Sequence, residues 1–151
     1  MEIIKGGVTA AKGFCAAGLN AGIKNNEKKD MAMVYSEKPC VTAGTFTTNK
    51  VFAAPVKWDK DVVANSPFAQ AVVVNSGVAN ACTGKEGDDA CAAEAKAVSE
   101  ALQVPESAVL VASTGVIGAQ LPMDKICAGI KELPKKLGSS LDHGTLAAEA
   151  I

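Results

Sequence analysis

The sequence predicts an α/β fold in which helices pack against a sheet. Two short valine-rich apolar runs, 71–74 and 108–112, are each followed by a loop of small polar residues and then by helix-forming residues. Strand, loop and helix in alternation are typical of layered α/β proteins. With 151 residues the chain is long enough to bury a substantial core, and we expect a single domain over 1–151.

The first third of the chain is predicted to form strands joined by turns. Apolar runs at 14–23, 31–35 and 41–48 are separated by polar breaks, the clearest of which is 24–30. Short apolar runs between turn residues are typical of strands and hairpins.

The middle of the chain contains the first strand–loop–helix unit. Residues 50–64, with Pro55 near their start, predict a short helix that is entered through an extended residue. The strand 71–74 then leads into a polar loop from Asn75 to Gly84. Good helix formers fill 86–102, where we expect the alanines at 90, 93, 97 and 101 to line one face.

The second unit begins with the strand 108–112 and turns at 113–118. It continues in a helix from 123 to about 131. A last helix is expected to begin at Thr145.

Charge and hydropathy argue against several classes of function. Fifteen lysines, no arginine and sixteen acidic residues give a formal net charge of -1, which provides no basic field for nucleic acid. No apolar run is long enough for a membrane span, and the N-terminus lacks an export signal. We therefore expect a cytoplasmic protein that binds neither nucleic acid nor membrane.

The cysteines, the histidine and the acidic helix residues give no sign of a metal or acid–base site. Five cysteines stand at wide spacings without a CxxC pair, so neither zinc nor a disulfide framework is predicted, and we expect free thiols in a reducing compartment. His143 lies in a stretch of turn composition, which favours a surface residue. A solvated helix face is expected for four carboxylates: Asp88, Asp89, Glu94 and Glu100.

Ser113, Thr114 and Gly115 directly follow the second strand and are the main catalytic candidates. Backbone N–H groups and a hydroxyl at a strand's end can point at developing negative charge, which is how an oxyanion is stabilised. The alternative is that these residues only make a tight turn, with Gly118 relieving crowding.

The loop after the first strand holds weaker candidates for substrate binding, Asn75 and Asn80. Amides and hydroxyls on a loop suit a small polar ligand. The alternative is a solvated loop whose asparagines bond locally. Phosphate is not favoured, because no glycine-rich phosphate-binding motif is present.

Taken together and in order, these segments resemble the N-terminal part of the ornithine acetyltransferase family, also called bifunctional glutamate N-acetyltransferase, of arginine biosynthesis. The most specific blocks are VNSGVANACTG at 74–84, in which Val78 replaces an asparagine common in the family, and VASTGVIGAQLPMDKI at 111–126. The other matching segments are Gly7–Ala10, Lys12–Phe14, Ala16–Gly18, Thr47–Asn49 and Ala53–Val56.

The resemblance implies a layered α/β/β/α sandwich of the self-processing N-terminal-threonine acyltransferase type, incomplete in this chain. It also implies transfer of acetyl from N-acetylornithine to glutamate through an acetyl-threonine, whose threonine becomes N-terminal when the precursor cleaves itself. Thr114 and Gly115 match the oxyanion-hole pair of the family, through the hydroxyl of the first and the backbone N–H of the second.

The nucleophile and a substrate-binding lysine expected from the resemblance lie beyond Ile151. We therefore expect the N-terminal part of an α chain that pairs with a β chain of the same precursor in a hetero-oligomer. Alone, it is expected to be inactive and to expose strand edges and apolar faces. The resemblance implies no cofactor or metal, with acetyl-CoA as a co-substrate only in bifunctional members. Two alternatives stay open, a related N-terminal-nucleophile amidase or aminopeptidase and a non-catalytic small-molecule-binding fragment.

Overall fold

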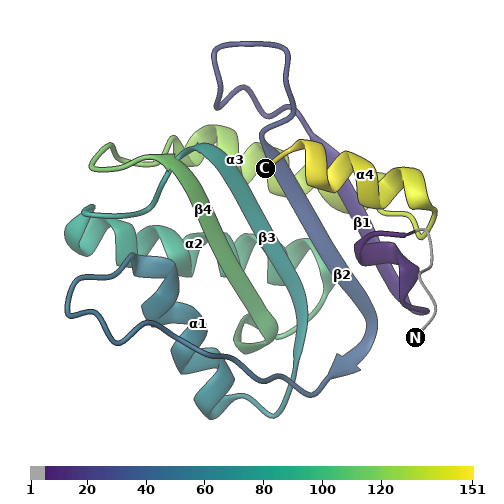
Figure 1. Ribbon diagram of the computed structural model, residues 1–151, viewed down its shortest axis with the longest axis horizontal. Helices are drawn as coiled ribbons and strands as arrows, with labels where there is room; N and C mark the ends of the chain where they lie inside the picture. The colour runs from purple at the N-terminus through teal and green to yellow at the C-terminus, as the bar shows by residue number, and fades with distance from the viewer. Residues whose placement is uncertain (1–5) are drawn as a thin grey trace.

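The computed structural model describes residues 6–151 and contains a four-stranded sheet with helices on both faces (Figure 1). Residues 1–5, part of the N-terminal stretch that lacks an export signal, lie outside the described residues. The strands are β1 (Phe14–Leu19), β2 (Met31–Cys40), β3 (Ala69–Val78) and β4 (Val109–Val116). The α-helices are α1 (Ala54–Asn65), α2 (Gly84–Leu102), α3 (Met123–Glu132) and α4 (Leu141–Glu149). Short 3-10 turns are η1 (Val8–Ala10), η2 (Glu106–Ala108) and η3 (Leu133–Lys136).

The strands lie in the order β1-β2-β3-β4, antiparallel except for the parallel pair β3–β4. Because α2 connects the two parallel strands, β3, α2 and β4 form a βαβ unit. The predicted pair of strand–loop–helix units is confirmed as β3–α2 and β4–α3. The carboxyl ends of β3 and β4 therefore lie side by side at one end of the strands, where open α/β sheets commonly bind ligands.

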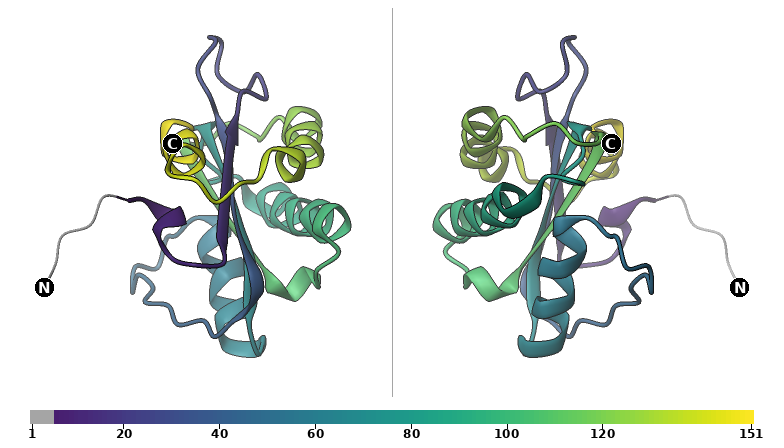
Figure 2. Two further views of the ribbon diagram at one scale, coloured as in Figure 1. Left: turned by 90° about the vertical axis from the view of Figure 1, so that its right-hand side faces the viewer. Right: turned by 90° about the vertical axis from the view of Figure 1, so that its left-hand side faces the viewer.

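The two faces of the sheet are covered differently, as the edge-on views of Figure 2 show. On one face α2 and α3 bury the main core, and β3 and β4 contribute to it Ala71, Val73, Val109 and Val111. On the other face α4 packs on β1 and β2 through small side chains: Ala16, Ala32, Ala147 and Ala150. Side chains alternate between faces along a strand, so odd-numbered residues of β3 and β4 face α2 and α3.

Helix α1 covers the outer edge of β4 with side chains instead of a further strand. The Trp58 Nε1–H donates to the Val109 carbonyl at 2.9 Å, and the Val111 N–H donates to the Asp59 carboxylate at 2.9 Å. Unpaired groups on an edge strand invite pairing with another chain. These two bonds give the Val109 carbonyl and the Val111 N–H on that edge hydrogen-bond partners within the molecule.

Replacing Trp58 with phenylalanine is expected to lower the free energy of unfolding by about 1–2 kcal/mol, because the Val109 carbonyl loses its donor while the aromatic ring is largely kept. Urea unfolding followed by circular dichroism measures the change. Tyr35→Phe is the matched control, since it also removes one polar group from a half-buried aromatic residue but leaves the β4 edge intact. Equal effects of the two substitutions would contradict the edge-capping role of Trp58.

Residues 41–48 were expected as a strand and instead form a loop, so that prediction is wrong. Strand β2 continues past its predicted end at Tyr35 to Cys40, and β1 and β3 already pair with its two sides. The chain must then reach α1 beyond β4, and it crosses on the α4 side of the sheet (Figure 2). A strand there would have no free neighbour with which to pair.

Helix boundaries also differ from prediction. Helix α4 begins at Leu141, four residues before the expected Thr145, so His143 is helical and half-buried rather than part of a turn. Its Nδ1 lies 2.6 Å from the Ser140 hydroxyl. The predicted alanine face of α2 is wrong in part, because Ala93 is exposed. Among the described helices, none combines the length and apolarity that crossing a membrane requires.

Candidate oxyanion site

Ser113, Thr114 and Gly115, the residues predicted to stabilise an oxyanion and called the oxyanion turn below, lie at the carboxyl ends of the parallel strands. Thr114 pairs with Ser76 and Gly115 with Gly77, so Ser113–Gly115 belong to β4 itself and not to a loop after it. In the same way Asn75 and Ser76 belong to β3, which corrects the prediction of a loop beginning at Asn75. These strand ends could not be predicted from their polar residues. They are strands because the two segments pair with each other, and that pairing is not encoded in either segment alone.

Hydrogen bonds connect the loops that follow the two strands. The Ala79 N–H donates to the Val116 carbonyl at 2.8 Å, and the Gly118 N–H donates to the Ala81 carbonyl at 2.9 Å. The Gln120 side chain adds a bond to the Thr83 carbonyl at 3.1 Å. The backbone that follows Thr114 is therefore fixed to the loop after β3, and an oxyanion hole requires donors on such a fixed backbone.

Gly115 and Gly77 allow the two strand ends to approach closely. Both have positive φ angles, 132° and 109°, which side-chain-bearing residues rarely adopt. A Cβ on Gly115 would overlap the backbone of Gly77. The role of Gly77 could not be predicted from the sequence, because the pairing of these two glycines becomes visible only with the strand register.

Gly115→Ala is expected to lower the free energy of unfolding by about 3 kcal/mol, because backbone strain and overlap with Gly77 add together. Gly118→Ala is the matched control, since Gly118 also has a positive φ, 81°, but a Cβ there meets open space. We expect Gly118→Ala to lower the free energy of unfolding by about 1 kcal/mol. Thermal and urea unfolding compare the two, and equal losses would mean that the Gly77 contact is unimportant.

Thr114 is exposed, and strand alternation places its side chain on the α4 side of the sheet. Its register partner Ser76 faces the same side, where the Ser76 hydroxyl donates to the Ala150 carbonyl at 2.5 Å. Ala150 immediately follows α4, so this bond fixes the end of the helix to β3 beside the exposed Thr114.

The two asparagines predicted as substrate-binding candidates lie away from this face. Asn75 is fully buried and, as an odd-numbered residue of β3, faces α2 and α3. Asn80 is also fully buried, and its amide donates to the Gly87 carbonyl at 2.8 Å and accepts the Thr83 hydroxyl at 2.6 Å. These bonds give Asn80 a structural role at the start of α2.

Of the four carboxylates expected on a solvated helix face, Glu94 is an exception. It is fully buried on the inner side of α2, and within residues 6–151 neither oxygen has a hydrogen-bond partner. Burial, and to a lesser extent the negative charge of Asp59, raises the pKa of Glu94 to about 8. Burial also raises the pKa of Asp59 to about 6, opposed by the N–H that Val111 donates. Glu94 lies on the far side of the sheet from Thr114, so we assign it no role in the oxyanion site.

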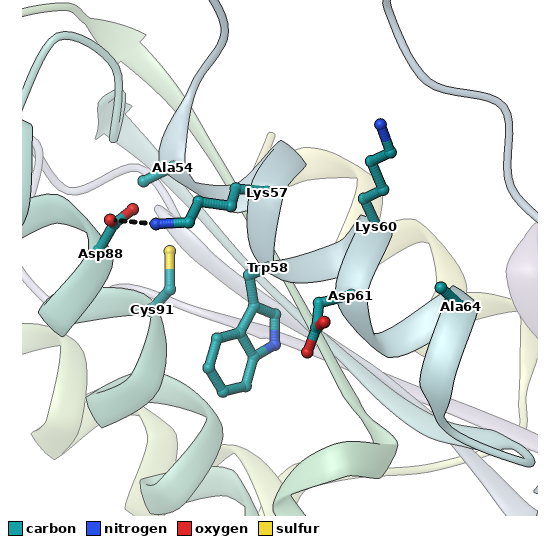
Figure 3. Close-up of a pocket in the computed structure, with 8 residues that line it drawn as sticks. All are labelled: Ala54, Lys57, Trp58, Lys60, Asp61, Ala64, Asp88 and Cys91. Carbon is teal, nitrogen blue, oxygen red and sulfur yellow. Dashed lines mark hydrogen bonds and ion pairs between the residues drawn. The ribbon is translucent and has the colours of Figure 1, made fainter.

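A cavity of about 540 Å³ lies between α1 and α2, also away from the oxyanion turn (Figure 3). Lys57 and Asp88 pair across it at 2.5 Å, and Trp58 and Cys91 lie along its walls. Burial, followed by the negative charge of Glu94, raises the pKa of the Cys91 thiol to about 12. The thiol is thus protonated at neutral pH and unsuited to nucleophilic attack. Within residues 6–151 no group of three or more potential ligands is arranged to hold a metal ion.

Comparison with known proteins gives consistent results along nearly the whole chain. A family model described as the ArgJ family matches residues 15–151. The arginine biosynthesis bifunctional protein ArgJ of Gloeobacter violaceus is 48% identical over 151 residues, which cover 99% of this chain and 36% of that relative. The same-named protein of Caldanaerobacter subterraneus is also 48% identical, over 100% of this chain and 36% of that relative.

Two solved structures have the same fold. The ornithine acetyltransferase of Mycobacterium tuberculosis, solved in complex with ornithine, gives a TM-score of 0.93 at 45% identity, covering 97% of this chain and 78% of that chain. The arginine biosynthesis bifunctional protein of Bacillus halodurans gives 0.91 at 43% identity, covering 97% and 75%. The chain spans little more than a third of the length of the curated relatives it matches.

Proposed function

This chain belongs to the ArgJ family, and from that premise we propose that it supplies the oxyanion hole of an acetyltransferase of arginine biosynthesis. The observation that carries the proposal is the pairing of Thr114 and Gly115 with Ser76 and Gly77, which presents an exposed hydroxyl at the ends of two parallel strands. The Thr114 hydroxyl and the Gly115 N–H are the proposed donors.

In the proposed reaction, acetyl passes from N-acetylornithine to glutamate in two steps. The hydroxyl of an N-terminal threonine, contributed by the longer protein, gives its proton to the α-amine of the same threonine and attacks the acetyl carbonyl. Ornithine leaves after its nitrogen takes up that proton. The amine of glutamate then attacks the acetyl-threonine ester and releases the hydroxyl. Each step passes through a tetrahedral oxyanion, which Thr114 and Gly115 stabilise. The same pair serves the self-cleavage that creates the threonine.

We further propose that the sheet is one layer of an α/β/β/α sandwich, completed by a β chain of the same precursor in a hetero-oligomer. The α4 side of β3 and β4 supports this, because the even-numbered Val72, Val74 and Leu110 are only half-buried there. Beyond the turn, Val116 and Ile117 are 65% and 66% exposed. A second sheet on this face would cover these apolar residues and bring a nucleophile towards Thr114.

The proposed enzyme works in the cytoplasm and needs no cofactor, since the acetyl group travels on the threonine oxygen. Acetyl-CoA enters only as an alternative acetyl donor. A hydrolytic N-terminal-nucleophile amidase would use the same oxyanion hole, but the solved relative that binds ornithine favours an amino-acid substrate.

The proposal is tested with the longer protein that contains this chain, supplied with N-acetylornithine and glutamate. We expect ornithine and N-acetylglutamate to form in equal amounts, measured by mass spectrometry. Ornithine with free acetate and no N-acetylglutamate would indicate a hydrolase. Saturable binding of ornithine without turnover would indicate a binding module, and either result would overturn the proposal.

A further inference from the structure

Asn75 and Ser113 are cross-strand neighbours one position before the Ser76–Thr114 pair. Both are odd-numbered, so their side chains face α2 and α3, opposite to Thr114. The Asn75 side-chain N–H donates to the Val78 carbonyl at 2.8 Å, which holds the end of β3 around Gly77. The pair therefore lies directly behind the oxyanion turn, on its covered side.

Each member of this pair has a buried oxygen that lacks a partner. Within residues 6–151, neither Asn75 Oδ1 nor Ser113 Oγ forms a hydrogen bond. Buried polar atoms in native proteins are nearly always paired, either with protein or with an ordered water. Asn75 and Ser113 are cross-strand partners, so their side chains lie side by side on the same face of the sheet. One water that accepts from the Ser113 hydroxyl and donates to the Asn75 amide oxygen would satisfy both atoms.

We infer that Asn75 and Ser113 are positioning residues that hold one ordered water between them and thereby fix the end of β4 that carries Thr114 and Gly115. Ser113 is covalently linked to Thr114, so a Ser113 hydroxyl held on the covered side limits movement of the backbone from which the Thr114 side chain and its hydroxyl project. Asn75 ties the same water to β3, against whose Gly77 the Gly115 backbone packs. Neither side chain contacts the substrate.

The water is tested directly by high-resolution crystal structures of the unchanged protein and of Ser113→Ala. We expect a water within hydrogen-bond distance of both Asn75 Oδ1 and Ser113 Oγ, and its loss or displacement in the variant. A direct bond between the two side chains, or a dry site in the unchanged protein, would overturn the inference. This result does not depend on enzymatic activity.

The kinetic consequence rests on the proposed function and is tested in the longer enzyme. Ser113→Ala is expected to lower kcat for acetyl transfer about 10- to 100-fold and to change KM less than about twofold, because the donors are misplaced while the substrate contacts remain. Ser113→Thr keeps the hydroxyl and should restore most of kcat.

Ser99→Ala is the matched control, because it removes a serine that bonds the Val104 carbonyl at 2.6 Å beyond the end of α2. We expect it to leave kcat unchanged even if stability falls. An unchanged kcat in Ser113→Ala would contradict the positioning role. If the enzyme without any substitution transfers no acetyl, the proposed function is contradicted instead. In that case the crystal structures still show whether Asn75 and Ser113 hold a water.

Discussion

Replacing Thr114 with alanine is expected to lower the rate of acetyl transfer by the longer enzyme roughly 100- to 1000-fold. The loss corresponds to about 3–4 kcal/mol of transition-state stabilisation, the usual effect of removing one oxyanion-hole donor. KM should change little, because the ground-state carbonyl carries less charge than the tetrahedral oxyanion. In the proposed mechanism self-cleavage passes through the same kind of intermediate, so we expect an uncut precursor to accumulate on denaturing gels.

Thr114→Ser removes the methyl group and keeps the hydroxyl, so it distinguishes the effects of the two groups. It retains the donor and should stay within about tenfold of the unchanged enzyme in both transfer and self-cleavage. Thr145→Ala, which removes an exposed threonine hydroxyl from α4, should leave both unaffected. Normal processing and a normal rate in Thr114→Ala would remove Thr114 from the mechanism.

The local elements of this fold could be predicted because their sequence patterns are strong. The apolar runs at 72–74 and 109–111 predict the cores of β3 and β4, and helix formers predict α2 and α3. The same patterns predict a strand just before Thr114, although they end it at Ala112 and β4 continues to Val116. These signals are local, and each depends on a few neighbouring residues.

What could not be predicted depends on contacts between distant segments. Asn75 and Ser113 look like loop residues, but parallel pairing makes them strand residues with inward-facing polar side chains. Trp58 and Asp59 cap the edge of β4 from more than fifty residues away. No periodicity within either segment encodes such pairings, so register and edge protection emerge only in three dimensions.

The burial of Glu94 also depends on contacts between segments that are distant in the sequence. Glutamate favours helices and is rarely buried, so its presence in α2 predicts an exposed side chain. The stripe of α2 that contacts the sheet and the neighbouring helices is instead Gly87, Ala90, Cys91, Glu94, Ala95 and Val98, with the usual spacing of three and four residues. Glu94 is held in that stripe by the small apolar residues around it.

Glu94→Gln is expected to remove most of the pH dependence of stability between about pH 5 and pH 8. The folded-state pKa of Glu94 is about 8, against 4.5 for an ordinary glutamate, so the folded protein keeps a proton that the unfolded chain releases in this range. The free energy of unfolding therefore falls as pH rises from about 4.5 to about 8, by roughly 4–5 kcal/mol. Glutamine resembles the neutral acid, so the variant should match the unchanged protein near pH 5 and exceed its stability near pH 8.

Urea unfolding at several pH values, followed by the fluorescence of the single tryptophan, measures this difference. Some pH dependence should persist below about pH 6 in Glu94→Gln, because Asp59 also keeps a raised pKa of about 6. Glu100→Gln changes an exposed residue of the same helix and should keep the full pH dependence. Parallel curves for Glu94→Gln and the unchanged protein would mean that the Glu94 carboxyl finds a charge partner or water in solution, because only such compensation keeps a buried carboxylate ionised at neutral pH.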